Sequence, residues 1–184
     1  GRRLVSGAEF IVATSAQEKK ELVSSGMESQ RIVIRRNGID LSEFSNLPER
    51  GQMRSRFGIQ PDERVLLYLS RLSPKKNPEM LMRAFAKLDL PRTKLVLAGP
   101  NESGYLEKLQ RIRAELELES SIIFVGPLFG NEKISAMVDA DIFVLPSTNE
   151  NFGNVIAESV AAGTPVVITN KCGIAPFIRD RVGL

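Results

Sequence analysis

Two glutamates and a glycine form the pattern with the clearest chemical meaning. Glu150 lies in a polar loop, Gly153 follows it, and Glu158 is the only ionisable side chain in the apolar or small-residue stretch 155–163. A carboxylate among apolar groups must find partners or lose its charge. Glu158 is therefore predicted either to accept hydrogen bonds from ligand hydroxyls or to pair with a cation such as Lys76 or Arg179.

The same segment offers an anion-binding backbone. Gly153 allows close approach of the main chain and leaves the N–H groups of Asn154 and Val155 at the start of a predicted helix, where they attract phosphates. Glu150, in the loop just before, has two interpretations: it accepts hydrogen bonds from a bound polyol, or it is an exposed or capping acid.

A second polar loop, 70–77, carries cations directly before another predicted helix. Arg71, Lys75 and Lys76 precede Asn77, the predicted N-cap, and Pro78, the first helical residue. Basic side chains next to a helix N-terminus indicate a phosphate site, with a solvated basic turn as the alternative.

These loops must be positioned by a repeating strand and helix pattern. Runs rich in Val, Ile and Leu predict seven buried strands at 10–14, 31–35, 65–69, 94–98, 122–125, 142–145 and 166–169. Apolar stripes predict helices over 77–88, over 103–118 and from Asn131, while 155–163 indicates a buried helix and 46–51 an exposed loop. The predicted stripes are Leu81, Ala84, Phe85 and Leu88; Tyr105, Leu109, Ile112 and Leu116; and Ile134, Met137 and Val138.

Continuously apolar strands that alternate with helices predict an α/β fold. We expect one Rossmann-like, doubly wound parallel sheet with helices on both faces. Ligands of such sheets bind beyond the carboxyl ends of the strands, which is where the polar loops fall.

Composition excludes several kinds of site. The 184 residues contain one cysteine, Cys172, and no histidine, so a disulfide framework, a cysteine-based zinc site and a histidine base are all excluded. No apolar run approaches the roughly 18 residues of a membrane helix, and no secretory leader is recognised, which favours the cytoplasm. The net charge of +3 does not indicate nucleic acid, but Arg31, Arg35 and Arg36 leave open a weak contact at the inner membrane face.

Together these residues resemble family 4 of the glycosyltransferases, retaining enzymes with two Rossmann-like domains in the GT-B fold. The resemblance covers essentially the whole chain, and segment 150–158, Glu-Asn-Phe-Gly-Asn-Val-Ile-Ala-Glu, reproduces the family's two-glutamate motif. Gly-Thr-Pro-Val-Val follows at 163–167. Arg71 with Lys76, and the segments 37–40, 98–99 and 124–126, also fall in family order. Asn37 and Gly38 are predicted to form a tight turn without a functional role, with Asp40 starting the next segment.

The resemblance implies a role for each matched residue. Arg71 and Lys76 would neutralise a diphosphate, Glu150 would contact the donor sugar, and Glu158 would bond the ribose. Leu128 would lie beside the base and bond it through its main chain. The remaining donor-binding residues implied are Asn151, Phe152, Gly153, Asn154 and Val155.

The resemblance also implies that the chain is half of an enzyme. Residues 1–184 would be the C-terminal nucleotide-sugar-binding domain, without the N-terminal domain that holds the acceptor and with the C-terminal end cut short after 180–184. The expected reaction is transfer of a hexosyl or related sugar from UDP or GDP to a hydroxyl, with retention of configuration. No metal or other cofactor is expected, and the domain alone is expected to be inactive.

Two other function classes remain open. One is a sugar-nucleotide epimerase or a phosphorylase of the same fold, and the other is a non-catalytic nucleotide-binding module. A dehydrogenase is disfavoured because no Gly-x-Gly-x-x-Gly turn follows a strand.

Overall fold

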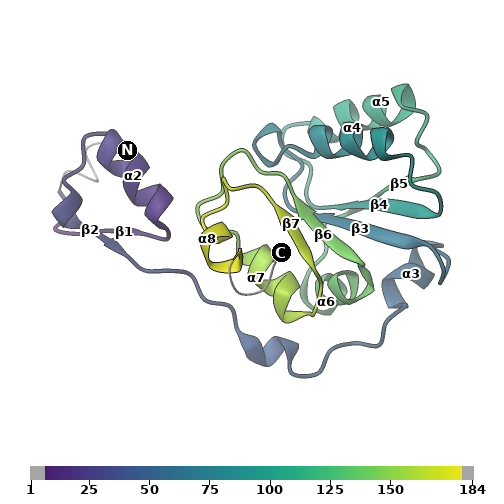
Figure 1. Ribbon diagram of the computed structural model, residues 1–184, viewed down its shortest axis with the longest axis horizontal. Helices are drawn as coiled ribbons and strands as arrows, with labels where there is room; N and C mark the ends of the chain where they lie inside the picture. Colours follow the sequence, from purple (N-terminus) through teal and green to yellow (C-terminus); the bar gives the residue numbers. More distant parts are fainter. Residues whose placement is uncertain (1–6, 180–184) are drawn as a thin grey trace.

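The computed structural model describes residues 7–179 and contains two parallel sheets (Figure 1). The smaller sheet pairs β1 (Ile11–Ala13) with β2 (Ile32–Ile34), and helix α2 (Ala16–Ser24) connects them. The larger sheet has the order β5-β4-β3-β6-β7. Its strands are β3 (Arg64–Leu69), β4 (Thr93–Ala98), β5 (Ile122–Gly126), β6 (Ile142–Leu145) and β7 (Val166–Ile168).

Helices cover both faces of the larger sheet. On one face α4 (Pro78–Leu88) packs beside α5 (Tyr105–Glu115), and on the other α6 (Gly130–Asp139) packs against α3 (Gln52–Arg56) and α7 (Asn154–Ala161) (Figure 1). The short helix α8 (Ala175–Ile178) follows β7, and 3-10 turns occupy Ser29–Arg31, Leu41–Phe44 and Pro74–Lys76. The predicted Rossmann-like, doubly wound α/β fold is confirmed.

The strand order reverses direction at β3. Strand β3 pairs with β4 on one side and with β6 on the other, with Leu66 opposite Ile142 and Leu67 opposite Phe143. The loops that follow β3 and β6 are about seventy residues apart in the chain, yet they leave adjacent strand ends. Open α/β sheets bind ligands at such a reversal point, so the two polar loops share the expected ligand position.

The core of the larger sheet is apolar, as the strand runs predict. Leu67, Leu95, Phe143 and Leu145 are fully buried between the helix layers. Tyr68 is buried among them, its hydroxyl donates to the main-chain oxygen of Arg71 over 2.8 Å, and burial raises the pKa of its phenol. The start of the cation-bearing loop is thereby anchored to the core.

Several expectations on local structure are wrong. The first two strand runs form their own sheet, so five of the seven runs make the main sheet. Segment 37–38 has no assigned turn or other regular structure, in contrast to the predicted turn, although the side chain of Asp40 does cap the next 3-10 turn through the N–H of Ser42. Leu88 is 59% exposed because α4 ends there.

Asn77 starts α4 by a different route from the one predicted. Its side chain makes no capping hydrogen bond, and its backbone is left-handed, with φ 56°. Its N–H bonds back to the oxygens of Ser73 and Pro74, which closes the turn before the helix. Asparagine tolerates this conformation better than most residues, and Pro78 does occupy the first helical turn as predicted.

A buried ionic network at the opposite edge of the sheet holds α3 to α6. The Asp139 carboxylate accepts from the N–H groups of Gly51, Met53 and Arg54, and so satisfies the N-terminus of α3. The Arg54 guanidinium donates to the main-chain oxygens of Asp139 and Glu63 and to the Asp141 carboxylate. These residues lie at the amino ends of β3 and β6 and are therefore structural.

Candidate functional site

Lys76 and Glu150 meet where the two polar loops come together. Lys76 ends the 3-10 turn after β3 and is 7% exposed, and its ammonium donates to Oε2 of Glu150 in the loop after β6. Both the N–H and the hydroxyl of Thr148 donate to the Lys75 oxygen over 3.0 Å, which fixes the loops to each other. The structure therefore brings together two of the three residues, Arg71, Lys76 and Glu150, that the family resemblance implies for catalysis at the diphosphate and the donor sugar.

The Glu150 loop is held from its other side by the loop after β7. The N–H of Glu150 donates to the Lys171 oxygen over 3.0 Å, and the N–H of Gly173 donates to the Glu150 oxygen over 2.9 Å. Phe152 is 8% exposed and joins the core with Cys172, so its side chain anchors the loop. The Cys172 thiol is buried, and burial raises its pKa.

Gly153 opens α7 in a conformation that suits glycine. Its φ is +98°, and a Cβ at this position would lie 2.6 Å from Cδ1 of Ile156 and 3.3 Å from Cγ of Glu150. No acceptor within residues 7–179 bonds the N–H groups of Asn154 and Val155, which are the first two of the helix. The helix N-terminus thus presents unpaired donors beside Glu150, as an anion site requires.

The asparagines of this loop contact the N-terminal unit, formed by β1, α2 and β2. Asn151 donates to Glu18 of α2 over 2.8 Å, and Oδ1 of Asn154 accepts from Asn37 over 3.1 Å. Asn149 donates to Glu21 of α2 over 2.8 Å. Sequence reasoning missed these partners, since no local pattern links positions more than a hundred residues apart.

The ion pair of Arg71 is separate from the pair of Lys76 and Glu150. The Arg71 guanidinium pairs with Glu102 in the loop after β4 over 2.8 Å, and its side chain is 55% exposed. An exposed pair of this kind contributes little to stability, so the guanidinium can exchange Glu102 for another anion at small cost.

Glu158 has a cation partner that the sequence did not suggest. Lys133 of α6 donates to Oε2 of Glu158 over 2.9 Å, and both side chains are about one fifth exposed. The expected partners Lys76 and Arg179 make no such pair. Helix α7 is also less buried than predicted, with Ile156 and Ser159 as its fully buried side chains. Glu158 thus has a cation partner in Lys133, and its carboxylate is still partly exposed to solvent.

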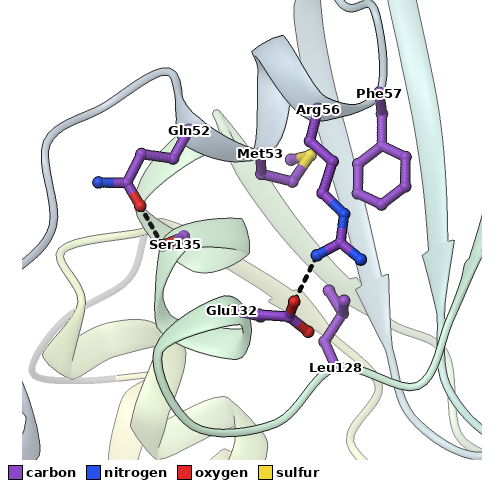
Figure 2. Close-up of a pocket in the computed structure, with 7 residues that line it drawn as sticks. All are labelled: Gln52, Met53, Arg56, Phe57, Leu128, Glu132 and Ser135. Atoms are coloured by element: carbon purple, nitrogen blue, oxygen red, sulfur yellow. Dashed lines mark hydrogen bonds and ion pairs between the residues drawn. The ribbon is translucent and has the colours of Figure 1, made fainter.

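Leu128 follows β5 and is 6% exposed, with its side chain turned into a cavity between α3 and α6 (Figure 2). The cavity measures about 240 Å³, and the Arg56–Glu132 ion pair crosses its rim. It shares no lining residue with the Lys76 and Glu150 site and is smaller than most cavities that hold organic ligands. Contact of the Leu128 main chain with a base therefore stays a prediction.

Residues 7–179 contain neither a membrane-spanning helix nor a candidate metal cluster. No helix in this part is long and apolar enough to cross a membrane. No group of three or more His, Cys, Asp or Glu side chains there is arranged to hold a metal ion.

The family model of glycosyl transferases group 1 matches residues 49–184. The chain belongs to this family. Among curated relatives, the D-inositol 3-phosphate glycosyltransferase of Kineococcus radiotolerans is 33% identical over 97% of this chain and 43% of its own length. The D-inositol 3-phosphate glycosyltransferase 2 of Catenulispora acidiphila is 36% identical over 97% of this chain and 44% of its own. The chain thus spans less than half of these group 1 relatives.

Solved structures agree with this family. The Anabaena protein HepE in complex with UDP and glucose matches with a TM-score of 0.86 and 26% identity, over 96% of this chain and 49% of that one. The sucrose-phosphate synthase of Thermosynechococcus elongatus matches with a TM-score of 0.83 and 25% identity, over 100% of this chain and 46% of that one. This glycosyltransferase domain has the fold of one half of a two-domain GT-B enzyme.

Proposed function

We propose that this group 1 domain is the donor-binding half of a retaining glycosyltransferase of family 4, and that it binds a nucleoside diphosphate sugar between the β3 and β6 loops. One observation carries the proposal: the Lys76 ammonium lies against Glu150, beside the unpaired N–H groups that open α7. A cation and helix amides that converge at the reversal point of a doubly wound sheet favour a diphosphate.

The charge on the leaving group explains why these groups accelerate transfer. As the bond from the anomeric carbon to the diphosphate oxygen breaks, its electron pair leaves on the diphosphate. The acceptor hydroxyl oxygen forms the new bond to that carbon, and its proton passes to the departing diphosphate. Lys76 and the amides of Gly153, Asn154 and Val155 stabilise the growing negative charge because they are already held in place, and Arg71 adds its charge once its guanidinium exchanges Glu102 for the diphosphate. These groups supply the compensating charge without a metal ion.

The two glutamates serve the uncharged parts of the donor. Glu150 accepts hydrogen bonds from the sugar, since its carboxylate lies next to the cation that holds the phosphates. Glu158 bonds the ribose hydroxyls, and its partial exposure beside Lys133 supports this role. Leu128 contacts the base through its main chain, while Asn151 and Phe152 hold the loop between the glutamates in shape.

The acceptor half belongs to a preceding N-terminal domain in this proposal. The relatives are about twice as long as the chain, and the β1 and β2 pair exposes Phe10, Val12 and Val33 by 50–60%. Two strands alone are marginally stable, so these apolar side chains are suited to packing against further structure. The donor domain by itself is accordingly expected to be inactive.

The test is the stereochemistry of transfer by a protein that contains this chain joined to its acceptor half. A donor with an α-linked sugar should give an α-linked product, which the anomeric proton coupling in NMR reports. A β-linked product would contradict retention. An altered sugar nucleotide without transfer would favour an epimerase, and binding without any product would favour a non-catalytic module.

A further inference from the structure

A second polar cleft lies between the N-terminal unit and the start of α7. Its volume is about 500 Å³, and its lining includes Thr14, Arg35, Arg36, Asn37 and Asn154. Thr14 follows β1 and Arg35 follows β2, so the cleft is at the carboxyl ends of this parallel pair. Ligands of parallel sheets bind at the carboxyl ends of the strands, and the cleft lies at these ends in the smaller sheet. We call it the Arg35–Arg36 cleft.

The cleft is electropositive because its two arginines have no acidic partner in the part of the chain that the structure describes. No carboxylate lines it, and within residues 7–179 no Asp or Glu forms an ion pair with Arg35 or Arg36. The Arg36 guanidinium stacks over the ring of Phe177, 4.4 Å from its centroid, which occupies its face and leaves its N–H edge for an acceptor. Two guanidinium groups without counter-charges in one concave site favour an anion that can accept paired hydrogen bonds.

The cleft shares one wall with the proposed donor site. Asn154 is the first residue of α7, its Oδ1 accepts from Nδ2 of Asn37, and its unpaired N–H belongs to the helix start. A ligand in the Arg35–Arg36 cleft therefore lies beside the diphosphate end of the donor. An acceptor must occupy that position for its hydroxyl to reach the anomeric carbon.

We propose that the Arg35–Arg36 cleft binds the phosphate group of a phosphorylated acceptor, a sugar phosphate or polyol phosphate, either free or as a lipid headgroup. The acceptor role rests on the proposed donor function, whereas the anion site rests on the cleft alone. The two arginines hold the phosphate, which leaves a hydroxyl of the same molecule turned towards the donor.

The test is an amide NMR titration of the 184-residue chain with glycerol 3-phosphate, with glycerol as the uncharged match. Glycerol 3-phosphate should shift Asn37, Gly38 and Asn154, and glycerol should not. Replacing both arginines, Arg35→Gln with Arg36→Gln, should weaken binding about tenfold or more, since two charge-assisted contacts are lost. The matched control is Arg111→Gln on α5, at the far side of the larger sheet, which should leave binding unchanged (Figure 1).

Vesicles distinguish the two sources of the phosphate. Sedimentation with phosphatidylcholine vesicles, with and without phosphatidylglycerol, is compared for the same variants. Binding of glycerol 3-phosphate without vesicle binding supports a soluble acceptor. Binding to phosphatidylglycerol vesicles that depends on Arg35 and Arg36 supports a lipid headgroup. Binding of neither probe, or an equal loss in Arg111→Gln, overturns the cleft as an anion site.

Titration with UDP distinguishes a failure of the cleft proposal from a failure of the donor-site proposal. Glycerol 3-phosphate and UDP should bind together, because the two proposals assign the phosphate to Arg35 and Arg36 and the diphosphate to Lys76 and the amides of α7. Displacement of glycerol 3-phosphate by UDP would overturn the acceptor assignment, since both would then use one site. Failure of UDP to bind at all would overturn the donor proposal, while the arginine dependence of glycerol 3-phosphate binding would still decide whether the cleft is an anion site.

Discussion

The Lys76 ammonium donates a hydrogen bond to the Glu150 carboxylate, and both side chains are largely buried. Each charge neutralises the other where the β3 and β6 loops meet. A diphosphate that binds here must compete with Glu150 for Lys76. The donor sugar then gives Glu150 a replacement partner, because sugar hydroxyls donate hydrogen bonds to carboxylates. In the proposed donor site the pair would therefore link recognition of the phosphate to recognition of the sugar.

Replacing Glu150→Gln should strengthen binding of UDP and weaken the preference for a sugar-bearing donor. UDP has no sugar for Glu150 to contact, so loss of the carboxylate releases Lys76 to the phosphates. The expected gain for UDP is about 1 kcal/mol, or roughly fivefold. Calorimetric titration with UDP and with a UDP-sugar measures both effects. Weaker UDP binding in this variant would contradict the competition between Glu150 and phosphate.

Gly153→Ala should destabilise the domain and weaken donor binding together. A non-glycine residue at positive φ costs about 1–2 kcal/mol, and here the new methyl group also meets Ile156 at 2.6 Å. Gly163→Ala is the matched control, since Gly163 has φ +82° with open space around its Cβ position. Urea unfolding and UDP titration should show the strain in both variants and the loss of affinity in Gly153→Ala. Unchanged UDP binding by Gly153→Ala would show that Gly153 does not belong to the donor site.

The layered fold and the main loops could be predicted from the sequence because their signals are local. Apolar runs predicted the five strands of the main sheet, whereas the contact between Lys76 and Glu150 was not predicted, because it depends on the order in which those strands pair. The separate pairing of β1 with β2 could not be predicted, since apolar runs carry no information on which strand they pair with.

Individual side-chain partners were the least predictable part. Asn77 was interpreted as a side-chain cap, but its backbone closes the turn. Glu158 needed a cation, and the sequence could not identify Lys133 because the choice depends on how α6 packs against α7. The buried pair of Arg54 and Asp139 left no sequence signal, since charged residues at helix ends are usually solvated.

Arg54→Ala should cost about 3 kcal/mol of the free energy of unfolding. The change leaves the Asp139 and Glu63 oxygens without their donor, at a position that is 5% exposed. Arg56→Ala, in the same helix, removes only an exposed ion pair with Glu132 and should cost less than about 1 kcal/mol. Urea unfolding followed by circular dichroism compares the two. Equal costs would show that the network does not hold α3 in place.

Asp141 should make the domain less stable in acid. Burial raises the pKa of this carboxyl, but the N–H of Val65 and the cations Arg50 and Arg54 outweigh that effect and hold it below the ordinary value of 3.8. A lowered folded-state pKa stabilises the domain above the unfolded value, and this stabilisation is lost as pH falls through the folded pKa.

The measurement for Asp141 is urea unfolding between about pH 5 and pH 3. Stability should fall in this window, and Asp141→Asn should be less stable at pH 5 with a smaller dependence on pH. The exposed Glu115, changed to Gln, is the matched control and should keep the pH dependence of the parent chain. An Asp141→Asn protein with the parent's full acid dependence would assign the effect to other carboxylates.

The most direct test of the donor site is the affinity of the 184-residue chain for UDP in two neighbouring lysine variants. Lys76→Ala should weaken binding by about 10- to 100-fold, because a charge-assisted hydrogen bond to phosphate contributes about 1.5–3 kcal/mol. Lys75→Ala should bind like the parent, since its side chain is exposed and only its main chain holds the loop. Equal affinities for the parent chain and Lys76→Ala would contradict the donor site described above.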